Sequence, residues 1–466
     1  MSSMEESFQD NHLRFLALED RLDVFELSFD GVYLWERIRN LVKVTIMRAD
    51  GLIESGSGSD DSASEYLAAG TNLLTNLFEK NPFFADEHDV LFWGRGRRQL
   101  DDGCWWEMQC DPIHTALDLD YLQVERPLHH RHFTPPRTEV LRYLDLIEYL
   151  QIAIRKLGLV SCTLDDELAH RLAVVNDELA DEFGVEIDLQ RIAKIKILEQ
   201  RAYQPLYRRF LDTVDPDLVL LVKSGGKEPF IQTCQEMGIT TVELQHGAFD
   251  RYNCNYSFPG DRTKRAFPDF FFAFGDYWHE EVPLPVPDER IVSVGYPYLE
   301  RKVARFSDTS ADEQLLFISQ NIISDDLAAF ATEFNSQCPD DLRVVYKLHP
   351  GESASEHPAL VESDIDIIGG NESIYPHLAR SRYLVGASST AVFEGLCFGV
   401  EPFLVDFPLI SVREAFLERG DATLVSTPTA LLTALRADNG VPGDVDHYFE
   451  PNALETIADS IDRIRD

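Results

Sequence analysis

Five short polar motifs each follow an apolar run, which is the pattern expected where a buried β-strand ends. In α/β sheets, ligands bind at the carboxyl ends of parallel strands, because the loops that follow the strands gather at one edge of the sheet. We therefore expect the chemistry of this chain at the motifs "VKSGGK" (222–227), "ELQHG" (243–247), "VGYP" (294–297), "YKLHPGE" (346–352) and "GASSTAVFEG" (386–395).

The hydroxyl cluster Ser388, Ser389 and Thr390 lies where a strand is predicted to turn into a helix. Hydroxyls and free N–H groups at such a turn form an anion site, and the helix dipole favours negative charge there. Glu394 follows one helical turn later, where a carboxylate can accept both hydroxyls of a ribose. The alternative is that Ser388 caps the helix and Glu394 is an ordinary first-turn acid. Because the anion site and the carboxylate that could accept the ribose are one helical turn apart, we favour nucleotide binding.

His349 and Pro350 end another apolar strand, and Lys347 lies two residues before the histidine. Proline stops the ladder and fixes the direction of the preceding side chain. The imidazole can donate to a phosphate oxygen, and the lysine adds a point charge. Taken alone, the motif would fit a surface histidine before a turn better than a phosphate site.

The end of "TTVELQHGAF" places Gln245, His246 and Gly247 at the edge of the same cleft. An imidazole of ordinary pKa near 6.5 suits proton transfer from an acceptor hydroxyl, and glycine allows close approach. The alternative is a hydrogen-bonded strand end without a catalytic role. Lys223 and Ser224, in a loop that lacks the Walker pattern, either present N–H groups to a ligand or form a plain tight turn.

The segment "GRGRRQ" concentrates Arg95, Arg97 and Arg98 against the prevailing acidic charge. These arginines either face an anionic acceptor or pair with neighbouring carboxylates. The Asp-x-Asp pairs, at 118 and 120 and at 364 and 366, are expected by chance in so acidic a chain. The sequence therefore predicts no metal site.

The elements that would position these residues are alternating strands and helices from residue 217 onward, which indicates parallel sheets. Earlier helices are expected over 34–49, 66–78, 138–157, 165–183 and 189–214, with Thr138 as an N-cap and a hairpin turn at Asp102-Gly103. The predicted fold is α/β, with two Rossmann-like doubly wound domains facing each other across a cleft. We place the first domain at 1–262, the nucleotide-binding domain at 263–445, and a helix that packs back at 446–466.

The chain of 466 residues carries a formal net charge of −39. Such acidity is typical of proteins from salt-loaded cytoplasm, and it leaves no basic face for nucleic acid. Seven cysteines without a C-x-x-C pair indicate an intracellular, reducing compartment. The sequence shows neither a signal peptide nor a membrane span.

The His-Pro pair, followed some forty residues later by Ser-Ser-Thr and a helical glutamate, resembles the C-terminal half of bacterial capsule polysaccharide transferases and polysialyltransferases. The Gln-His-Gly strand end is similar to that of glycerophosphate-polymer transferases of the same glycosyltransferase-B superfold. The resemblance covers residue 217 to about residue 407. It implies that His349 and Ser388 to Thr390 hold the donor phosphate, and that Asp102, in "DDG", is a second candidate for the catalytic base beside His246.

The implied function is an inverting, metal-independent glycosyltransferase of surface polysaccharide or glycan assembly. Its substrates would be a nucleotide sugar, with family analogy favouring a CMP-activated acidic sugar, and a glycan or lipid-linked acceptor. No cofactor is implied. The expected location is the cytoplasm, with peripheral association at the inner face of the membrane as an option. A polyol-phosphate transferase, a nucleotide-sugar 2-epimerase and a glycan-binding protein without activity remain as alternatives.

Overall fold

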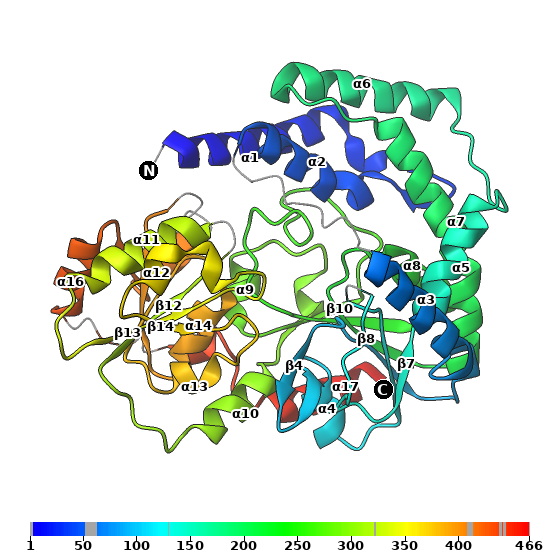
Figure 1. Ribbon diagram of the computed structural model, residues 1–466. Coiled ribbons are helices and arrows are strands. Elements are labelled where there is room, and N and C mark those ends of the chain that lie inside the picture. The colour runs from blue at the N-terminus through cyan, green and yellow to red at the C-terminus, as the bar shows by residue number, and fades with distance from the viewer. Residues whose placement is uncertain are drawn as a thin grey trace.

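The computed structural model describes residues 3–51, 63–128, 130–320, 323–407, 413–437, 440 and 444–465. They form two parallel sheets of seven and six strands, with helices on both faces of each sheet (Figure 1). The carboxyl edges of the two sheets meet at a shared cavity. The predicted fold class, two Rossmann-like doubly wound α/β domains facing across a cleft, is confirmed.

The first sheet has the order β11-β10-β9-β8-β3-β6-β7. Its strands are β3 (Val90–Trp93), β6 (Tyr121–Glu125), β7 (Leu141–Tyr143), β8 (Leu218–Val222), β9 (Thr240–Leu244), β10 (Phe270–Ala273) and β11 (Ile291–Ser293). Every residue of β8 is buried, as expected of a parallel strand covered on both faces.

The second sheet has the order β14-β13-β12-β15-β16-β17. Its strands are β12 (Gln314–Ile318), β13 (Arg343–Lys347), β14 (Asp366–Ile368), β15 (Tyr383–Gly386), β16 (Glu401–Val405) and β17 (Thr423–Val425). Two short antiparallel pairs stand apart from both sheets: β1 (Ser28–Phe29) with β2 (Val32–Tyr33), and β4 (Arg98–Asp101) with β5 (Cys104–Glu107).

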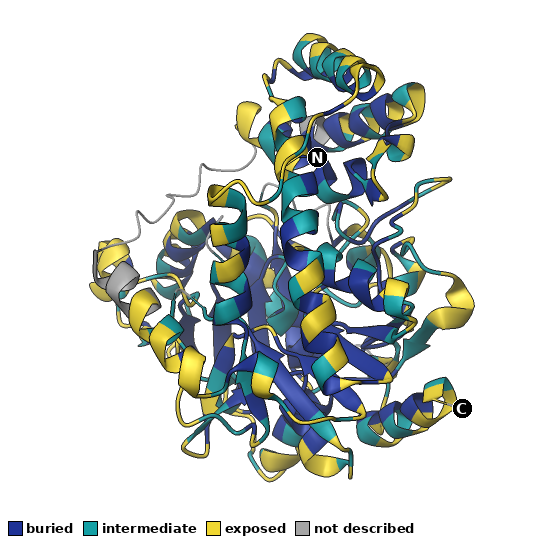
Figure 2. Cartoon of the chain, turned by 90° about the vertical axis from the view of Figure 1, so that its right-hand side faces the viewer, coloured by how far each residue is buried: buried dark blue, intermediate teal, exposed yellow. Residues whose placement is uncertain are grey.

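The helices cover the sheets and leave their polar faces outside, so that exposed residues lie around a buried interior (Figure 2). Their bounds are α1 (Ser3–Leu22), α2 (Trp35–Ala49), α3 (Ala63–Phe78), α4 (Asp111–Ala116), α5 (Asp145–Lys156), α6 (Asp166–Phe183), α7 (Leu189–Val214), α8 (Glu228–Met237), α9 (Asp276–Glu280), α10 (Pro297–Arg305), α11 (Ser324–Asn335), α12 (Pro358–Val361), α13 (Tyr375–Leu378), α14 (Thr390–Leu396), α15 (Glu414–Glu418), α16 (Pro428–Leu435) and α17 (Ala453–Arg465). Helices α1, α2, α6 and the start of α7 share a separate apolar cluster away from the sheets (Figure 1).

The change from the first sheet to the second lies between Ser293 and Gln314, later than the boundary at residue 263 that we predicted. Phe270, Phe271 and Phe272 pair in parallel with residues 242–244, so the run "DFFFAFG" extends the first sheet. The apolar pattern of this run suits either sheet equally, because pairing between distant strands leaves no local trace. Helix α17 returns to the first domain, where Arg465 forms ion pairs with Asp89 and Asp217.

The helix expected over 138–157 begins instead at Asp145. Leu141–Tyr143 forms β7 and pairs with β6, so Thr138 is not an N-cap. The Thr138 hydroxyl donates to Asp111 Oδ1 at 2.5 Å. Tertiary pairing has overridden a helical pattern here.

Candidate active site between the two sheets

A cavity of about 350 Å³ lies between the carboxyl edges of the two sheets. The first domain lines it with the loop after β3, the loop after β9 and Tyr296. The second domain lines it with the ends of β12 and β13, helix α13 and the turn before α14. Six of the seven residues predicted to bind a nucleotide line this one cavity: Lys347, His349, Pro350, Ser389, Thr390 and Glu394.

Gln245 supports the end of β9 through backbone contacts. Its Oε1 accepts from the Phe274 N–H at 2.7 Å, and its Nε2 donates to the Gly247 carbonyl at 3.1 Å. The side chain is buried, with both ends of its amide engaged. Gln245 therefore fixes the path of the loop that carries His246.

His246 lines the cavity and is linked through Nδ1 to the Tyr256 hydroxyl at 3.3 Å. Burial, followed by the charges of Arg95, Lys223 and Lys227, lowers the pKa of His246 to about 3. The imidazole is therefore neutral near pH 7, the protonation state that can accept a proton.

The two domains touch directly beside His246. The Ala248 N–H donates to Thr390 Oγ1 at 2.8 Å, across the cleft. A Cβ added at Gly247 would lie 3.0 Å from the same oxygen. Glycine therefore permits the close approach of the second domain, and a larger residue would displace the Thr390 hydroxyl.

Lys223 and Ser224 lie at the end of β8, behind the cavity rather than on its wall. The Ser224 N–H donates to Glu243 Oε2 at 3.1 Å, and the serine is fully buried. Lys223 is exposed, and its charge acts on the His246 imidazole. In the same loop, Lys227 Nζ donates to the Val222 carbonyl at 2.5 Å.

Asp102 occupies the turn of the β4–β5 hairpin with a φ of 51°. Its carboxylate is exposed and forms ion pairs of 2.9 and 3.0 Å with Arg301 and Arg305. Asp102 is not among the residues that line the cavity. The structure thus gives this residue the hairpin-turn position and leaves His246 as the candidate base in the cleft.

Lys347 is a buried anchor at the end of β13. Its Nζ donates to the carbonyls of Leu348, Gly369 and Gly370 at 2.9, 2.9 and 2.8 Å. These three bonds use all three ammonium hydrogens. Burial lowers its pKa to about 8, and Lys347 contributes positive field to the cavity without a free donor.

His349 is held in one tautomer. The Gly351 N–H donates to His349 Nδ1 at 3.2 Å, so the ring proton belongs on Nε2 in the neutral form. Burial and the charges of Arg97 and Lys347 lower the pKa of His349, against an opposing effect of Glu352. The neutral Nε2–H is then a donor for an anionic oxygen at the cavity wall.

Ser388, Ser389 and Thr390 have different positions relative to the cavity. Ser388 lies behind the cavity, where its N–H donates to Gln320 Oε1 at 2.8 Å and its Oγ accepts from Gln320 Nε2 at 3.1 Å. Ser389 is the N-cap of α14 and accepts from the Ala391 N–H at 3.3 Å. Ser389 and Thr390 reach the cavity, whereas Ser388 supports the turn.

Glu394 is a buried carboxylate on the cavity wall, and it accepts a hydrogen bond from Tyr375. Burial raises its pKa to about 7, against the lowering effect of that hydrogen bond. The carboxylate therefore lies one helical turn beyond Thr390 and inside the cavity, as the spacing predicted.

Sequence reasoning left the role of the loop after β3 open. Arg98 forms ion pairs with Glu125 and Asp111 at 2.7 and 3.3 Å. For Arg98, the interpretation as a partner of neighbouring carboxylates is therefore the one that the structure shows. Arg95 and Arg97 instead line the cavity, and the described residues bring no carboxylate within 4.0 Å of either guanidinium. The sequence signal for them was the cluster of arginines in so acidic a chain, but only the structure shows which of the three lack acid partners.

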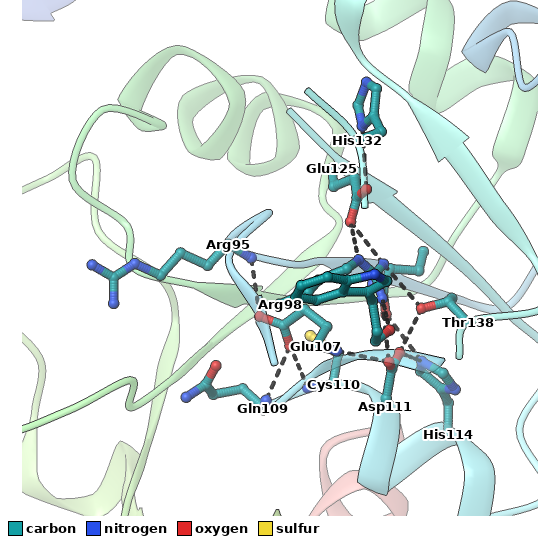
Figure 3. A network of polar contacts seen from close by, with 12 residues as sticks. Arg95, Arg98, Glu107, Gln109, Cys110, Asp111, His114, Glu125, His132 and Thr138 are labelled. Atoms are coloured by element: carbon teal, nitrogen blue, oxygen red, sulfur yellow. Dashed lines mark hydrogen bonds and ion pairs between the residues drawn. The ribbon is translucent and has the colours of Figure 1, made fainter. Parts of the chain in front are cut away.

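Glu107 anchors that loop. Its Oε1 accepts from the Arg95 N–H at 3.1 Å, and its Oε2 accepts from the N–H groups of Gln109 and Cys110 at 3.0 and 2.7 Å (Figure 3). The Arg95 side chain extends away from this network (Figure 3). Sequence reasoning missed Glu107, together with the cavity residues Gln109 and Tyr375, whereas Tyr296 belongs to the motif "VGYP" that it singled out.

The described part of the chain contains no group of three or more His, Cys, Asp or Glu side chains placed to hold a metal ion. Within the same residues, no helix has the length and hydropathy of a membrane span. All seven cysteines are free thiols.

No protein-family model matches the chain, and no curated protein matches it in sequence. Solved structures are similar to it in fold. UDP-GlcNAc 2-epimerase from Neisseria meningitidis, bound to UDP-GlcNAc, is 12% identical with a TM-score of 0.49 and matches 80% of this chain and 99% of its own. MurG from Acinetobacter baumannii is 10% identical with a TM-score of 0.47, over 81% and 99% of the two chains.

The wall teichoic acid polymerase TagF is 10% identical with a TM-score of 0.46, over 87% of this chain and 98% of its own. At such identities the likeness is one of fold. What the cleft does must therefore be argued from its residues, and membership of the capsule polysaccharide or polysialyltransferase families stays a prediction.

Proposed function

We propose that this chain is an inverting, metal-independent glycosyltransferase that moves a sugar from a nucleotide donor to a glycan or lipid-linked acceptor. One observation carries the proposal: in a chain of net charge −39, one cavity gathers the unpaired guanidinium groups of Arg95 and Arg97, a neutral imidazole N–H and a buried carboxylate. Phosphate needs the cations and donors, while ribose hydroxyls need the carboxylate. A nucleotide offers both.

The donor phosphates are assigned to Arg97, His349 Nε2–H and the hydroxyls of Ser389 and Thr390. Lys347 adds charge through space while it anchors the loop. Glu394 is assigned to the ribose. Guanidinium and neutral donors stabilise the negative charge that builds on the leaving phosphate in the transition state.

In the transfer step, the acceptor oxygen forms a bond to the anomeric carbon as the bond from that carbon to the donor phosphate oxygen breaks. The nucleotide leaves with the electron pair, and the acceptor proton goes to His246. One displacement inverts the anomeric carbon. A bound phosphate offsets the charges that lower the pKa of His246, which makes the imidazole a stronger base in the complex.

The test is calorimetric titration of CMP, CDP, UMP, UDP and GDP, run from low to molar KCl. At least one nucleotide should bind, and Arg97→Gln and Ser389→Ala should each weaken its binding by about tenfold or more, the range for a lost charge-assisted hydrogen bond. Arg209→Gln, on the exposed face of α7, is the matched control and should bind as the wild type does.

Absence of binding by all five nucleotides would reject the proposal. Inversion at the sugar C2 of a nucleotide sugar, with no acceptor present, would replace transfer by 2-epimerisation. Transfer of a polyol phosphate from its CDP-activated form would place the chain with polyol-phosphate transferases.

A further inference from the structure

Glu243 is a carboxylate in the interior of the first sheet. It belongs to β9, its side chain is fully buried, and its two neighbours in the strand, Val242 and Leu244, are apolar. Burial of a charged group costs several kcal/mol unless hydrogen bonds compensate for it. A glutamate is not needed to build such a strand, so its contacts indicate what it does.

The two oxygens of Glu243 have separate partners. Oε2 accepts from the Ser224 N–H at 3.1 Å, and Oε1 accepts from the Tyr256 hydroxyl at 2.5 Å. A contact of about 2.5–2.7 Å is characteristic of a hydroxyl bound to an ionised carboxylate. The same Tyr256 oxygen lies 3.3 Å from His246 Nδ1. Glutamate, tyrosine and histidine therefore form one chain of contacts from the sheet interior to the cavity.

We propose that Glu243 and Tyr256 are positioning residues that keep the His246 proton on Nδ1, so that Nε2 faces the cleft as the proton acceptor. The inference rests on the proposed function for the role of His246, but the tautomer is a property of the free protein.

The direction of the hydrogen bonds follows from proton counting. Tyr256 has one proton, and it goes to Glu243 when Glu243 is ionised. The tyrosine oxygen can then only accept from His246, which requires the proton on Nδ1. If Glu243 were protonated, Tyr256 could donate to Nδ1, and the ring proton would move to Nε2. The charge of Glu243 thus selects the tautomer.

Two features favour the ionised form of Glu243 against a pKa that is raised overall: the 2.5 Å contact with the Tyr256 hydroxyl and the charges of nearby lysines. Burial raises the pKa of Glu243, while the hydrogen bonds from Ser224 and Tyr256 and the charges of Lys264 and Lys227 oppose that rise. Burial, followed by the charges of Arg95, Lys223 and Lys227, lowers the pKa of His246 and keeps the ring neutral. A neutral ring with a fixed tautomer is what a general base requires.

The tautomer can be read directly by long-range ¹H–¹⁵N NMR of the full chain labelled with ¹⁵N-histidine, with His246→Gln used to assign the signal. The wild type should show a protonated Nδ1 and an unprotonated Nε2 near pH 7. A protonated Nε2 in the wild type would overturn the proposal.

Tyr256→Phe removes the hydroxyl and keeps the ring. It should shift His246 toward the Nε2–H tautomer, leave nucleotide affinity within about twofold, and lower kcat by about tenfold to a hundredfold, which reaches only the lower end of the range for general base catalysis because the base itself is kept. Tyr298→Phe is the matched control, because it removes the hydroxyl of another buried tyrosine, one that has no hydrogen-bond partner among the described residues. It should change none of these.

Glu243→Gln keeps the shape and a Tyr256 contact but loses the charge, so it should move the tautomer in the same direction and flatten the pH profile of kcat. An unchanged tautomer in both variants would reject the relay. The NMR result needs no substrate, so a relay that stands while all nucleotides fail to bind would reject the proposed function and not this inference.

Discussion

The two walls of the cleft hold their loops with buried charges of opposite sign. On the first-domain wall, the Glu107 carboxylate accepts three backbone N–H groups at 2.7–3.1 Å and fixes the loop that carries Arg95. On the second-domain wall, the Lys347 ammonium donates to three carbonyls at 2.8–2.9 Å and fixes the loop after β13. Each anchor satisfies backbone groups that no ladder reaches.

The charge of the anchoring side chain, negative for Glu107 and positive for Lys347, decides which groups of each wall remain for a ligand. An anchoring carboxylate engages N–H groups and leaves Arg95 and Arg97 to face the cavity as charges. An anchoring lysine is itself engaged, so its wall offers neutral donors: the His349 ring and the hydroxyls of Ser389 and Thr390. One wall therefore supplies charge, and the other supplies directed hydrogen bonds.

The largest effect is expected from Glu107→Ala. Three buried N–H groups lose their acceptor, and we expect the free energy of unfolding, measured in urea, to fall by about 3–5 kcal/mol. Glu107→Gln retains an acceptor oxygen and should lose about half as much. Glu139→Ala, at an exposed carboxylate, is the control and should be neutral. Equal stability of the Glu107→Ala and Glu139→Ala proteins would show that the carboxylate is not an anchor.

Lys347→Met should have the next largest effect. The thioether chain keeps the packing but leaves three carbonyls without their donor, at an expected loss of about 2–3 kcal/mol in urea unfolding. Arg97→Gln should do the opposite: it weakens nucleotide binding and leaves stability within about 0.5 kcal/mol. If Lys347→Met lost only affinity and no stability, the lysine would be a ligand residue and the contrast between the walls would fail.

Much of the second wall was predictable from the sequence, because parallel strands bring their carboxyl ends to one edge. The positions of His349, Ser389, Thr390 and Glu394 follow from counting along apolar strands and one helical turn. The carboxyl-end rule holds without knowledge of strand order.

The first wall was less predictable, because its roles depend on contacts distant in sequence. Glu107 lies 12 residues from the Arg95 N–H that it accepts, and Thr390 lies 142 residues from Ala248. Pairing of Phe270–Phe272 with β9 is likewise invisible in the local pattern. Side chains that bind backbone, such as Lys347 and Gln245, look the same in sequence as side chains that bind ligands.

The smallest effect is expected at Glu394. Like Glu107 it is a buried carboxylate, but it faces the cavity instead of anchoring a loop. Burial raises its pKa from 4.5 to about 7, and Tyr375 donates its one opposing hydrogen bond. A ribose diol binds the ionised form, so binding should release a proton below pH 7. Nucleotide affinity should therefore rise by up to tenfold per pH unit toward pH 7 and level off above it.

The terminal phosphate of a nucleotide also titrates, near pH 6, so the measurement must separate the two groups. Calorimetric titrations from pH 5.5 to 8 in buffers of different ionisation enthalpy count the protons released. Glu394→Gln should remove the component centred near pH 7 and keep the phosphate component. An identical proton count in the wild type and in Glu394→Gln would mean that this carboxylate does not meet the ribose. Glu394 would then be, like Glu107, a carboxylate that serves the fold alone, and the two walls would differ in their cations but not in their acids.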